Sequence, residues 1–169
     1  MFDILQKTLT GYEIIPIGPD NYADAWDVYA TNHDFFMLTG DKPASKEGIL
    51  ASLHQVPNGF DLSGKCFVML KQNGRVVAVT DLFAGYPTGD CLWLGLLLIH
   101  GDMQGRSVGS TIVKGIIDAG HTCGFTSIKL GVIDANAKAA QFWQSLGFVQ
   151  TGTSGNILVF SRSIDENTN

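Results

Sequence analysis

Charged residues are scarce in this sequence, and none of the basic ones form a run. Lysine and arginine number 11 against 16 acidic residues among 169, which gives a net charge of -5 at pH 7. Proteins that bind nucleic acid draw much of their affinity from basic patches that neutralise phosphates. The composition therefore argues against nucleic acid as a partner.

Cysteine is also sparse. The 3 cysteines, Cys66, Cys91 and Cys123, form no CxxC pair and have no cysteine–histidine spacing of a zinc site. An odd number with such spacing argues against a disulfide framework. We expect reduced, partly buried thiols and no metal site.

Long apolar runs are missing as well. The longest, CLWLGLLLI (Cys91–Ile99), is far shorter than the roughly 20 residues that span a bilayer. The first residues lack the basic start and apolar stretch of a secretory signal. With 45% hydrophobic residues the chain can still bury a sizeable core. We expect a cytoplasmic protein without a membrane partner, folded as a single domain over 1–169 with a frayed tail over about 165–169.

Turn residues and apolar spacing divide the first half of the chain. Asn73-Gly74 favours a tight hairpin turn, so we expect a strand on each side of it. The other elements expected here are a strand over 12–18, a helix over 22–32 capped by Asp20 or Asn21, a loop carrying His33 and Asp34, and a short helix opened by Ser45 within 45–55.

The second half alternates between strands and helices. A central strand over 91–100 is apolar on both faces, and Gly95 within it indicates a bulge. A helix follows from Val108 to Gly120, with Ser107 as a suitable N-cap. The remaining expected elements are a strand over 127–134, a helix capped by Asn136 that buries Ala139, Ala140, Phe142, Trp143 and Leu146, and a last strand over 156–164.

The connector DMQGRSVGS (Asp102–Ser110) is unusually rich in glycine and serine for a strand-to-helix turn. Backbone N–H groups at a helix start, with the positive end of the helix dipole behind them, bind phosphate. Gly105 and Gly109 would let the backbone approach a pyrophosphate, and Arg106 can add charge. Neither GxxxxGK[ST] nor GxGxxG occurs here. The connector indicates a different kind of phosphate site, with a plain turn as the alternative.

Two motifs at the right separation resemble the GCN5-related N-acetyltransferase (GNAT) family. IHGDMQGRSVGS is similar to its pyrophosphate loop, and NAKAAQFWQSLGF to its later helix, so that the likeness covers about 93–150. The resemblance implies an α/β fold with a mixed, mostly antiparallel central sheet, flanked by helices, whose central strands splay apart. It also implies acetyl-CoA as the cofactor, bound between the strands around 96–99 and 129–133.

The resemblance further implies which residues hold the cofactor. The pantetheine arm would pair with the central strand like an extra strand. The loop would hold the pyrophosphate, and Asn136 would reach the pantetheine. The expected cofactor-binding residues are Leu97, Leu98, Ile99, Gln104, Gly105, Arg106, Ser107, Val108, Gly109, Ser110, Asn136 and Trp143.

Two positions depart from the family pattern. Ser107 stands where the loop has its first glycine, and we expect it to adopt an ordinary backbone conformation with its N–H available. Trp143 stands where the family has a tyrosine that can protonate the leaving thiolate. An indole N–H cannot do so. A thiol with a pKa of roughly 8.5 can leave as a thiolate near neutral pH, so chemistry does not require that acid.

The general base is less well marked, because no glutamate lies on the central strand. Asp81 on the preceding strand and His100 at the end of the central strand are the main candidates for a catalytic role. His33 and Asp34 are further candidates, and both more readily fit the acceptor site. The expected acceptor-site residues are His33, Asp34, Phe35 and Tyr86.

These observations favour an N-acetyltransferase that moves an acetyl group from acetyl-CoA to a primary amine by direct attack. The acceptor would be a small molecule or an exposed peptide amine, and the sequence does not identify it. A non-catalytic acyl-CoA-binding module is the alternative, and a phosphate-ligand binder of unrelated type is a third. A homodimer is left open.

Overall fold

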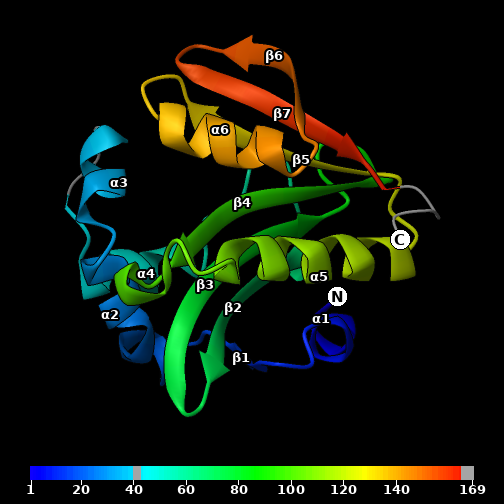
Figure 1. The fold of residues 1–169 in the computed structure, drawn as a ribbon. Helices are drawn as coiled ribbons and strands as arrows, with labels where there is room; N and C mark the ends of the chain where they lie inside the picture. The colour runs from blue at the N-terminus through cyan, green and yellow to red at the C-terminus, as the bar shows by residue number, and fades with distance from the viewer. Residues whose placement is uncertain (40–42, 165–169) are drawn as a thin grey trace.

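The computed structural model describes residues 1–39 and 43–164. Its described strands form one 7-stranded sheet in the order β1-β2-β3-β4-β5-β7-β6 (Figure 1). Neighbouring strands run antiparallel except β4 and β5, which are parallel. The strands are β1 (Glu13–Pro16), β2 (Lys65–Gln72), β3 (Arg75–Ala84), β4 (Cys91–Ile99), β5 (Ser127–Ile133), β6 (Val149–Ser154) and β7 (Ile157–Ser163). The predicted mixed, mostly antiparallel sheet is confirmed.

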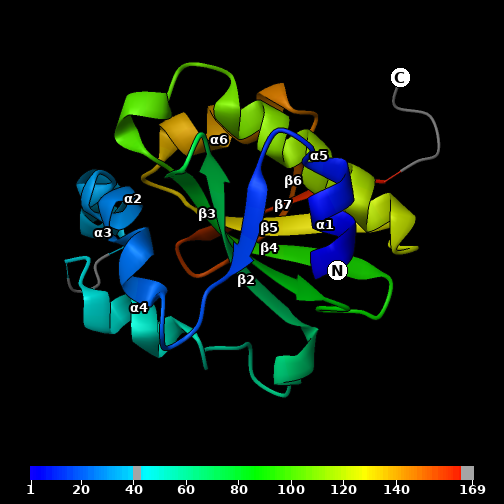
Figure 2. The ribbon, with the colours of Figure 1, turned by 90° about the horizontal axis from the view of Figure 1, so that it is seen from below.

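Helices cover both faces of this sheet (Figure 2). One core lies under α1, α5 and α6 and includes Leu5, Ile112 and Trp143. The other lies under α2 and α4 and includes Val28 and Ile49. The helices are α1 (Phe2–Thr8), α2 (Trp26–Ala30), α3 (His33–Leu38), α4 (Lys46–Ser52), α5 (Val108–Thr122) and α6 (Ala137–Ser145), with 3-10 turns η1 (Tyr22–Ala25), η2 (Leu62–Gly64) and η3 (Gly101–Met103).

The central strand β4 carries the predicted bulge at Gly95. Asp81 of β3 pairs with Leu96, whereas the next residue, Leu82, pairs with Leu94, so Gly95 is the extra residue of β4. Side chains alternate along a strand, and an extra residue reverses the alternation beyond it. Leu94 accordingly packs in the α5 core, whereas Leu96 packs against the α2–α4 core.

Beyond the bulge, β4 and β5 separate. They pair only over Cys91–Leu94 and Ser127–Leu130. β4 then continues along β3 to Ile99, and β5 continues along β7 to Ile133. In the described part of the chain, the two facing edges therefore present backbone N–H and C=O groups without a strand partner. The expected splay of the central strands is confirmed.

Several local predictions are also confirmed. The β2–β3 hairpin turns at Asn73 and Gly74, both at positive φ. Ser45 caps α4 by accepting a hydrogen bond from the Gly48 N–H at 3.0 Å. Asn136 caps α6 in the same way, since its Oδ1 accepts from the Ala139 N–H at 3.1 Å.

Other elements differ from the prediction. Helix α1 and strand β6 were not expected, because α1 is short and every residue of β6 is exposed, which removes the apolar alternation of a half-buried strand. A short helix, α3, replaces the expected loop at His33 and Asp34. The first strand is limited to Glu13–Pro16, and the helix after it begins as η1. The Asn21 side chain accepts a hydrogen bond from the Gly18 N–H and does not cap that helix. Of the five apolar positions expected to be buried by α6, only Trp143 is in the buried class.

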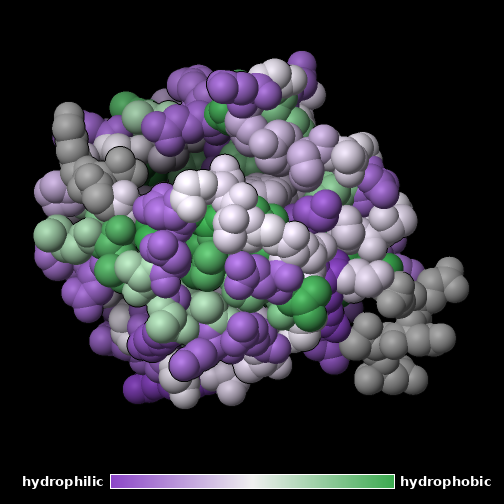
Figure 3. Space-filling view, turned by 90° about the horizontal axis from the view of Figure 1, so that it is seen from above, coloured by the Kyte–Doolittle hydropathy of each residue, from purple (hydrophilic) through white to green (hydrophobic). Residues whose placement is uncertain are grey.

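The surface mixes hydrophilic and hydrophobic residues, with most of the green in Figure 3 on its left half, the side of α3 in Figure 1. Met37 and Leu38 of α3 are among the exposed large hydrophobic residues. Cys66 and Cys91 are buried, Cys123 is exposed, and all three are free thiols, as expected. No helix among the described residues is long and apolar enough to cross a membrane. The tail expected to fray, 165–169, lies outside the described residues.

Replacing Gly95 by alanine should destabilise the protein by about 1–3 kcal/mol, because the new Cβ would lie 2.5 Å from Cε2 of Phe83. Gly89→Ala is the matched control, since a Cβ there meets no atom within 4 Å. Urea denaturation measures the free energy of unfolding of both variants. Equal stability of the two would show that Phe83 moves away freely and that the bulge does not require glycine.

Candidate functional site

The first turn of α5 presents backbone N–H groups that no side chain caps. Ser107 occupies the N-cap position, but among the described residues its side chain makes no capping hydrogen bond. Its carbonyl instead accepts from the Thr111 N–H at 3.0 Å and the Ser110 hydroxyl at 2.8 Å. The first N–H groups of a helix have no partner within the helix. With the helix dipole behind them, the N–H groups of 108–110 form a site suited to an anion.

The backbone of this loop is tightly turned. Ser107 has φ of 62° and Gly105 has φ of 70°. The expectation that Ser107 avoids positive φ was therefore wrong, as was its assignment as a side-chain cap. The loop closes onto α5 through a left-handed residue at the N-cap, where a Cβ is strained by of order 1 kcal/mol or more.

The start of α5 meets both the end of β4 and α6. A Cβ on Gly109 would lie 3.2 Å from Cζ of Phe142 and 3.6 Å from Cγ1 of Ile99. Glycine here avoids a tight contact with the Phe142 ring, a packing reason that differs from the predicted approach of a ligand. Because Asn136 caps α6 just after the end of β5, the loop and α6 both border the gap between the splayed strands.

Gln104 ties the loop to the junction of α2 and α3, on the face of the sheet opposite α5. Its Nε2 donates to Asn32 Oδ1 and to the Ile99 carbonyl, both at 3.1 Å. Asn32 also donates from Nδ2 to the Ile99 carbonyl at 2.9 Å. The carbonyl that ends β4 is thus held by two side-chain amides. The contacts of Asn32 with this loop could not be predicted from the sequence, because Ile99 and Gln104 lie 67 and 72 residues away along the chain.

Asp81 is buried on the face of the sheet opposite α5. Its Oδ2 forms an ion pair with Lys65 Nζ. Burial raises the pKa of Asp81 to about 6, although the hydrogen bond and charge of Lys65 lower it. Among the described residues, Asp81 Oδ1 has no hydrogen-bond partner. A carboxylate with one free oxygen and a pKa near neutrality is suited to accept a proton at physiological pH.

His100 lies elsewhere. Its ring is buried, with Nε2 2.9 Å from an Arg75 nitrogen and Nδ1 accepting from the Asp102 N–H at 3.2 Å. Arg75 begins β3, six residues before Asp81, which corresponds to roughly 20 Å along a strand. The structure therefore does not bring the two candidate bases together.

The expected acceptor-site residues fall into two groups on the α2–α4 side. On α3, His33 and Asp34 are exposed, and Phe35 packs edge-to-face on Phe36, which stacks on Tyr29. Tyr86 belongs to the second group, a chain of edge-to-face ring contacts formed by Phe83, Phe60, Tyr86 and Trp93. Asp81 lies between the two groups. On β3 it is two residues from Phe83. It is also close to Tyr29, whose pKa is raised mainly by burial and further by the charge of Asp81.

Trp143 packs within the α5-side core. It is 7% exposed and contacts the rings of Phe142 and Phe148 edge-to-face, with centroids 5.0 and 5.2 Å away. Its neighbours are therefore aromatic side chains of the protein.

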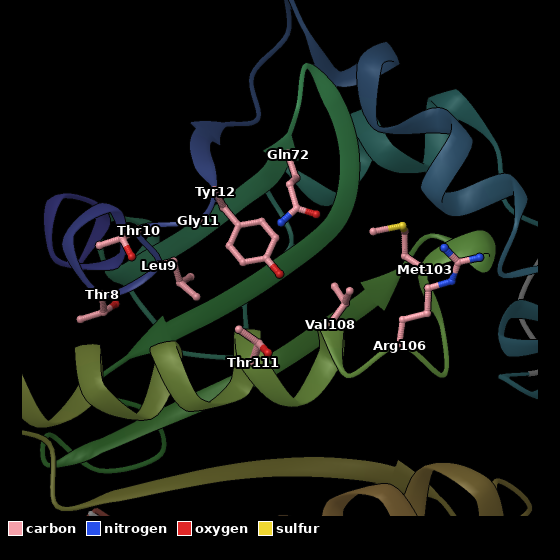
Figure 4. A pocket seen from close by; sticks show the side chains of 10 residues that line it. All are labelled: Thr8, Leu9, Thr10, Gly11, Tyr12, Gln72, Met103, Arg106, Val108 and Thr111. Carbon is pink, nitrogen blue, oxygen red and sulfur yellow. The ribbon is translucent and has the colours of Figure 1, made fainter.

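A cavity of about 480 Å³ lies beside the start of α5, on the side that faces α1 (Figure 4). Tyr12 and Gln72 point into it from the sheet side, and Met103 and Arg106 come from the loop. The sequence did not predict this cavity, because the connector after α1 forms one of its walls and α1 itself was not expected. It is separate from the gap between β4 and β5.

Comparison with known proteins identifies the family. The sequence matches the Acetyltransferase (GNAT) family over residues 25–148. The chain belongs to this family. Its members transfer acetyl groups from acetyl-CoA, so the protein is an N-acetyltransferase with acetyl-CoA as its cofactor. The uncapped N–H groups of α5 and the open edges of β4 and β5 fit the pyrophosphate and the extended arm of that cofactor. No curated protein matches the sequence.

Solved structures show the same fold. An acetyltransferase from Thermus thermophilus is 24% identical, with 90% of this chain and 96% of that chain covered and a TM-score of 0.76. The ribosomal-protein-S18-alanine N-acetyltransferase from Escherichia coli is 19% identical, with 94% and 99% covered and a TM-score of 0.66. PaiA N-acetyltransferase from Thermoplasma acidophilum, in complex with coenzyme A, is 14% identical, with 90% and 98% covered and a TM-score of 0.67.

Ser107→Gly should raise the free energy of unfolding by up to about 1 kcal/mol, because glycine adopts positive φ without steric cost. Ser107→Ala should change it by less than about 0.5 kcal/mol, since the serine side chain makes no capping bond to lose. Chemical denaturation of the three proteins checks both expectations. A loss of about 1 kcal/mol in Ser107→Ala would reveal a cap that forms in solution.

Proposed function

We propose that the protein acetylates a primary amine, of a small molecule or an exposed peptide, by direct attack of the amine on acetyl-CoA, with Asp81 as the general base. One observation carries this proposal. The bulge at Gly95 places the buried Asp81 carboxylate opposite Leu96, the first residue of β4 beyond the bulge, where β4 and β5 no longer pair. The proposed base on β3 and the open edge of β4 therefore lie on neighbouring strands.

The cofactor would be held mainly by backbone groups. The N–H groups of Val108, Gly109 and Ser110 would bind the pyrophosphate, with Gly105 and Ser107 shaping the loop and Arg106 adding charge. The open edge of β4 at Leu97, Leu98 and Ile99 would pair with the pantetheine arm. Gln104 would keep the loop in place, and Asn136 would border the arm from α6. Trp143 would support the site from the core.

The reaction requires few catalytic groups from the protein. Acetyl-CoA would supply the acetyl group as a thioester, and CoA would be the leaving group, as a thiolate. Asp81 would take the proton of the acceptor amine, and free backbone N–H groups of β4 near the bulge could donate to the carbonyl oxygen. Phe35 and the exposed His33 and Asp34 would line the acceptor's approach from α3, and Tyr86 would line it from the second aromatic group. His100, bound to Arg75 and Asp102, is not required in this scheme.

The decisive experiment is an acetylation screen. Purified protein and acetyl-CoA are offered amino acids, polyamines, aminoglycosides and peptides with a free amino terminus, and the release of free CoA is measured. Acetylated product from at least one amine is expected. Tight binding of acetyl-CoA without product from any amine would favour the non-catalytic binding module instead.

Binding of CoA should stabilise the protein. A hundredfold excess over Kd gives about 2.7 kcal/mol, or a melting shift on the order of 5 to 10 °C for a chain of this size. Arg106→Glu should weaken CoA binding roughly tenfold or more, because it replaces an attractive charge by a repulsive one. Lys114→Glu, on an exposed position two turns along α5, makes the same charge change and should leave Kd nearly unaltered. Equal Kd values for the two variants would remove Arg106 from the pyrophosphate site.

Asp81→Asn should lower kcat about 10²- to 10⁴-fold and leave the KM for acetyl-CoA nearly unchanged, because a base acts on the amine. In the parent, kcat/KM for the acceptor should rise as the pH passes upward through about 6, where Asp81 loses its proton. The variant should lack this limb. Asp118→Asn, at an exposed position of α5, is the control and should retain it. A retained limb in Asp81→Asn would assign the base to another residue.

A further inference from the structure

Lys65 is buried in an unusual setting for a lysine. Its side chain is 4% exposed, against 11% for Asp81, its partner in the ion pair. Nζ also donates to the Gln55 carbonyl at 2.9 Å and lies 4.7 Å from the centroid of the Phe83 ring and 5.3 Å from that of Phe67. A carboxylate, a carbonyl and two aromatic faces therefore surround one ammonium group.

Such a pair is not explained by stability. Removing two charges from water costs several kcal/mol per ion, and an apolar pair of the same volume is often as stable or more so. Lysine is almost never fully buried unless it is paired. A role of Lys65 in the function of Asp81 would explain why the pair is buried.

The geometry gives Lys65 a specific relation to Asp81. In the strand register, Lys65 of β2 lies opposite Phe83 of β3, so its side chain reaches two residues along β3 on the same face to contact Asp81 Oδ2. Oδ1 is left buried with no hydrogen-bond partner among the described residues, and so is the hydroxyl of Tyr29. One oxygen of the carboxylate is thus bound to Lys65, and the other is buried without a hydrogen-bond partner among the described residues.

We propose that Lys65 is a positioning residue for acetyl transfer: by binding Oδ2 it orients the Asp81 carboxylate with Oδ1 free for the proton of the acceptor amine, and it keeps that carboxylate ionised at neutral pH. The proposal rests on the proposed role of Asp81 as the base. In the step, the amine nitrogen bonds to the acetyl carbon, its proton goes to Oδ1, and the electron pair of the broken carbon–sulfur bond leaves with the sulfur. Lys65 neither gains nor loses a proton.

Removing the charge of Lys65 would raise the pKa of Asp81. The titratable groups that face Asp81 are Lys65 from β2 and Tyr29 from α2, whereas the buried thiol of Cys66 lies on the other face of the sheet. Burial raises the pKa of Asp81, and Lys65 is the cation that lowers it. Without the ammonium, only burial would act, and the carboxyl would stay protonated to higher pH. A protonated Asp81 cannot take the proton of the amine.

The test is the pH dependence of kcat/KM for one acceptor in Lys65→Met, Lys65→Arg and, as a control, Lys71→Met on the same strand. We expect Lys65→Met to move the acidic limb upward by about one pH unit or more. Its rate should fall about twofold or more at pH 7, fall further at lower pH, and return to within about threefold of the parent near pH 9. Lys65→Arg, which keeps the charge, should leave the limb within half a unit of the parent, and Lys71→Met should not move it.

A loss of rate in Lys65→Met that is equal at every pH would overturn the proposal, because a merely structural role leaves the limb in place. If Lys65→Met does not fold, Lys65→Gln removes the charge, keeps a donor for Oδ2, and should move the limb in the same direction. Asp81→Asn distinguishes the role of the proposed base from the role of Lys65. A limb that survives in Asp81→Asn contradicts the proposed base itself, whereas a limb lost in Asp81→Asn but unmoved in Lys65→Met contradicts only the role of Lys65.

Discussion

The extra residue at Gly95 is the constraint on which the site depends. Before it, β4 pairs with β5 and turns Leu94 toward α5; beyond it, the alternation is reversed and β4 follows β3 alone. A continuous ladder would have closed the strand edge that we propose for the cofactor's arm. The bulge also aligns Asp81 with Leu96, so the same irregularity opens the sheet and sets a carboxylate beside the opening.

The anion site at the start of α5 depends on contacts from distant parts of the chain. Gly109 lets α5 approach Phe142 of α6, and Gln104 and Asn32 together hold the carbonyl of Ile99. The contacts of Gly109 with Phe142 and of Asn32 with Ile99 join segments far apart in the sequence, and all of these contacts meet near the end of β4. The uncapped N–H groups are therefore held by packing on three sides, and the strained Ser107 is tolerated because that surrounding structure fixes the loop.

Features encoded by a few neighbouring residues could be predicted from the sequence. The Asn73-Gly74 turn, the Ser45 and Asn136 caps and the Gly95 bulge each follow from local backbone preferences. Strand β6 could not be predicted, because its residues gain order from pairing with β7 and leave no apolar pattern. The partner of Asp81 was missed for a similar reason. Lys65 lies at the start of β2, where a lysine resembles an ordinary exposed strand end, and only the register across β3 buries it.

Two clusters of charged and titratable side chains lie at opposite ends of β3, and burial distinguishes what they can do. Arg75 and Asp102 are 53% and 67% exposed, so water and salt screen their ion pair and it adds little beyond holding the ring of His100. Lys65 and Asp81 are almost wholly removed from water, where the charge of one strongly affects the protonation of the other. Of these two clusters, only the buried pair can adjust the pKa of a group that accepts the proton of an amine. That contrast, more than residue type, is why we propose the aspartate and not the histidine as the base.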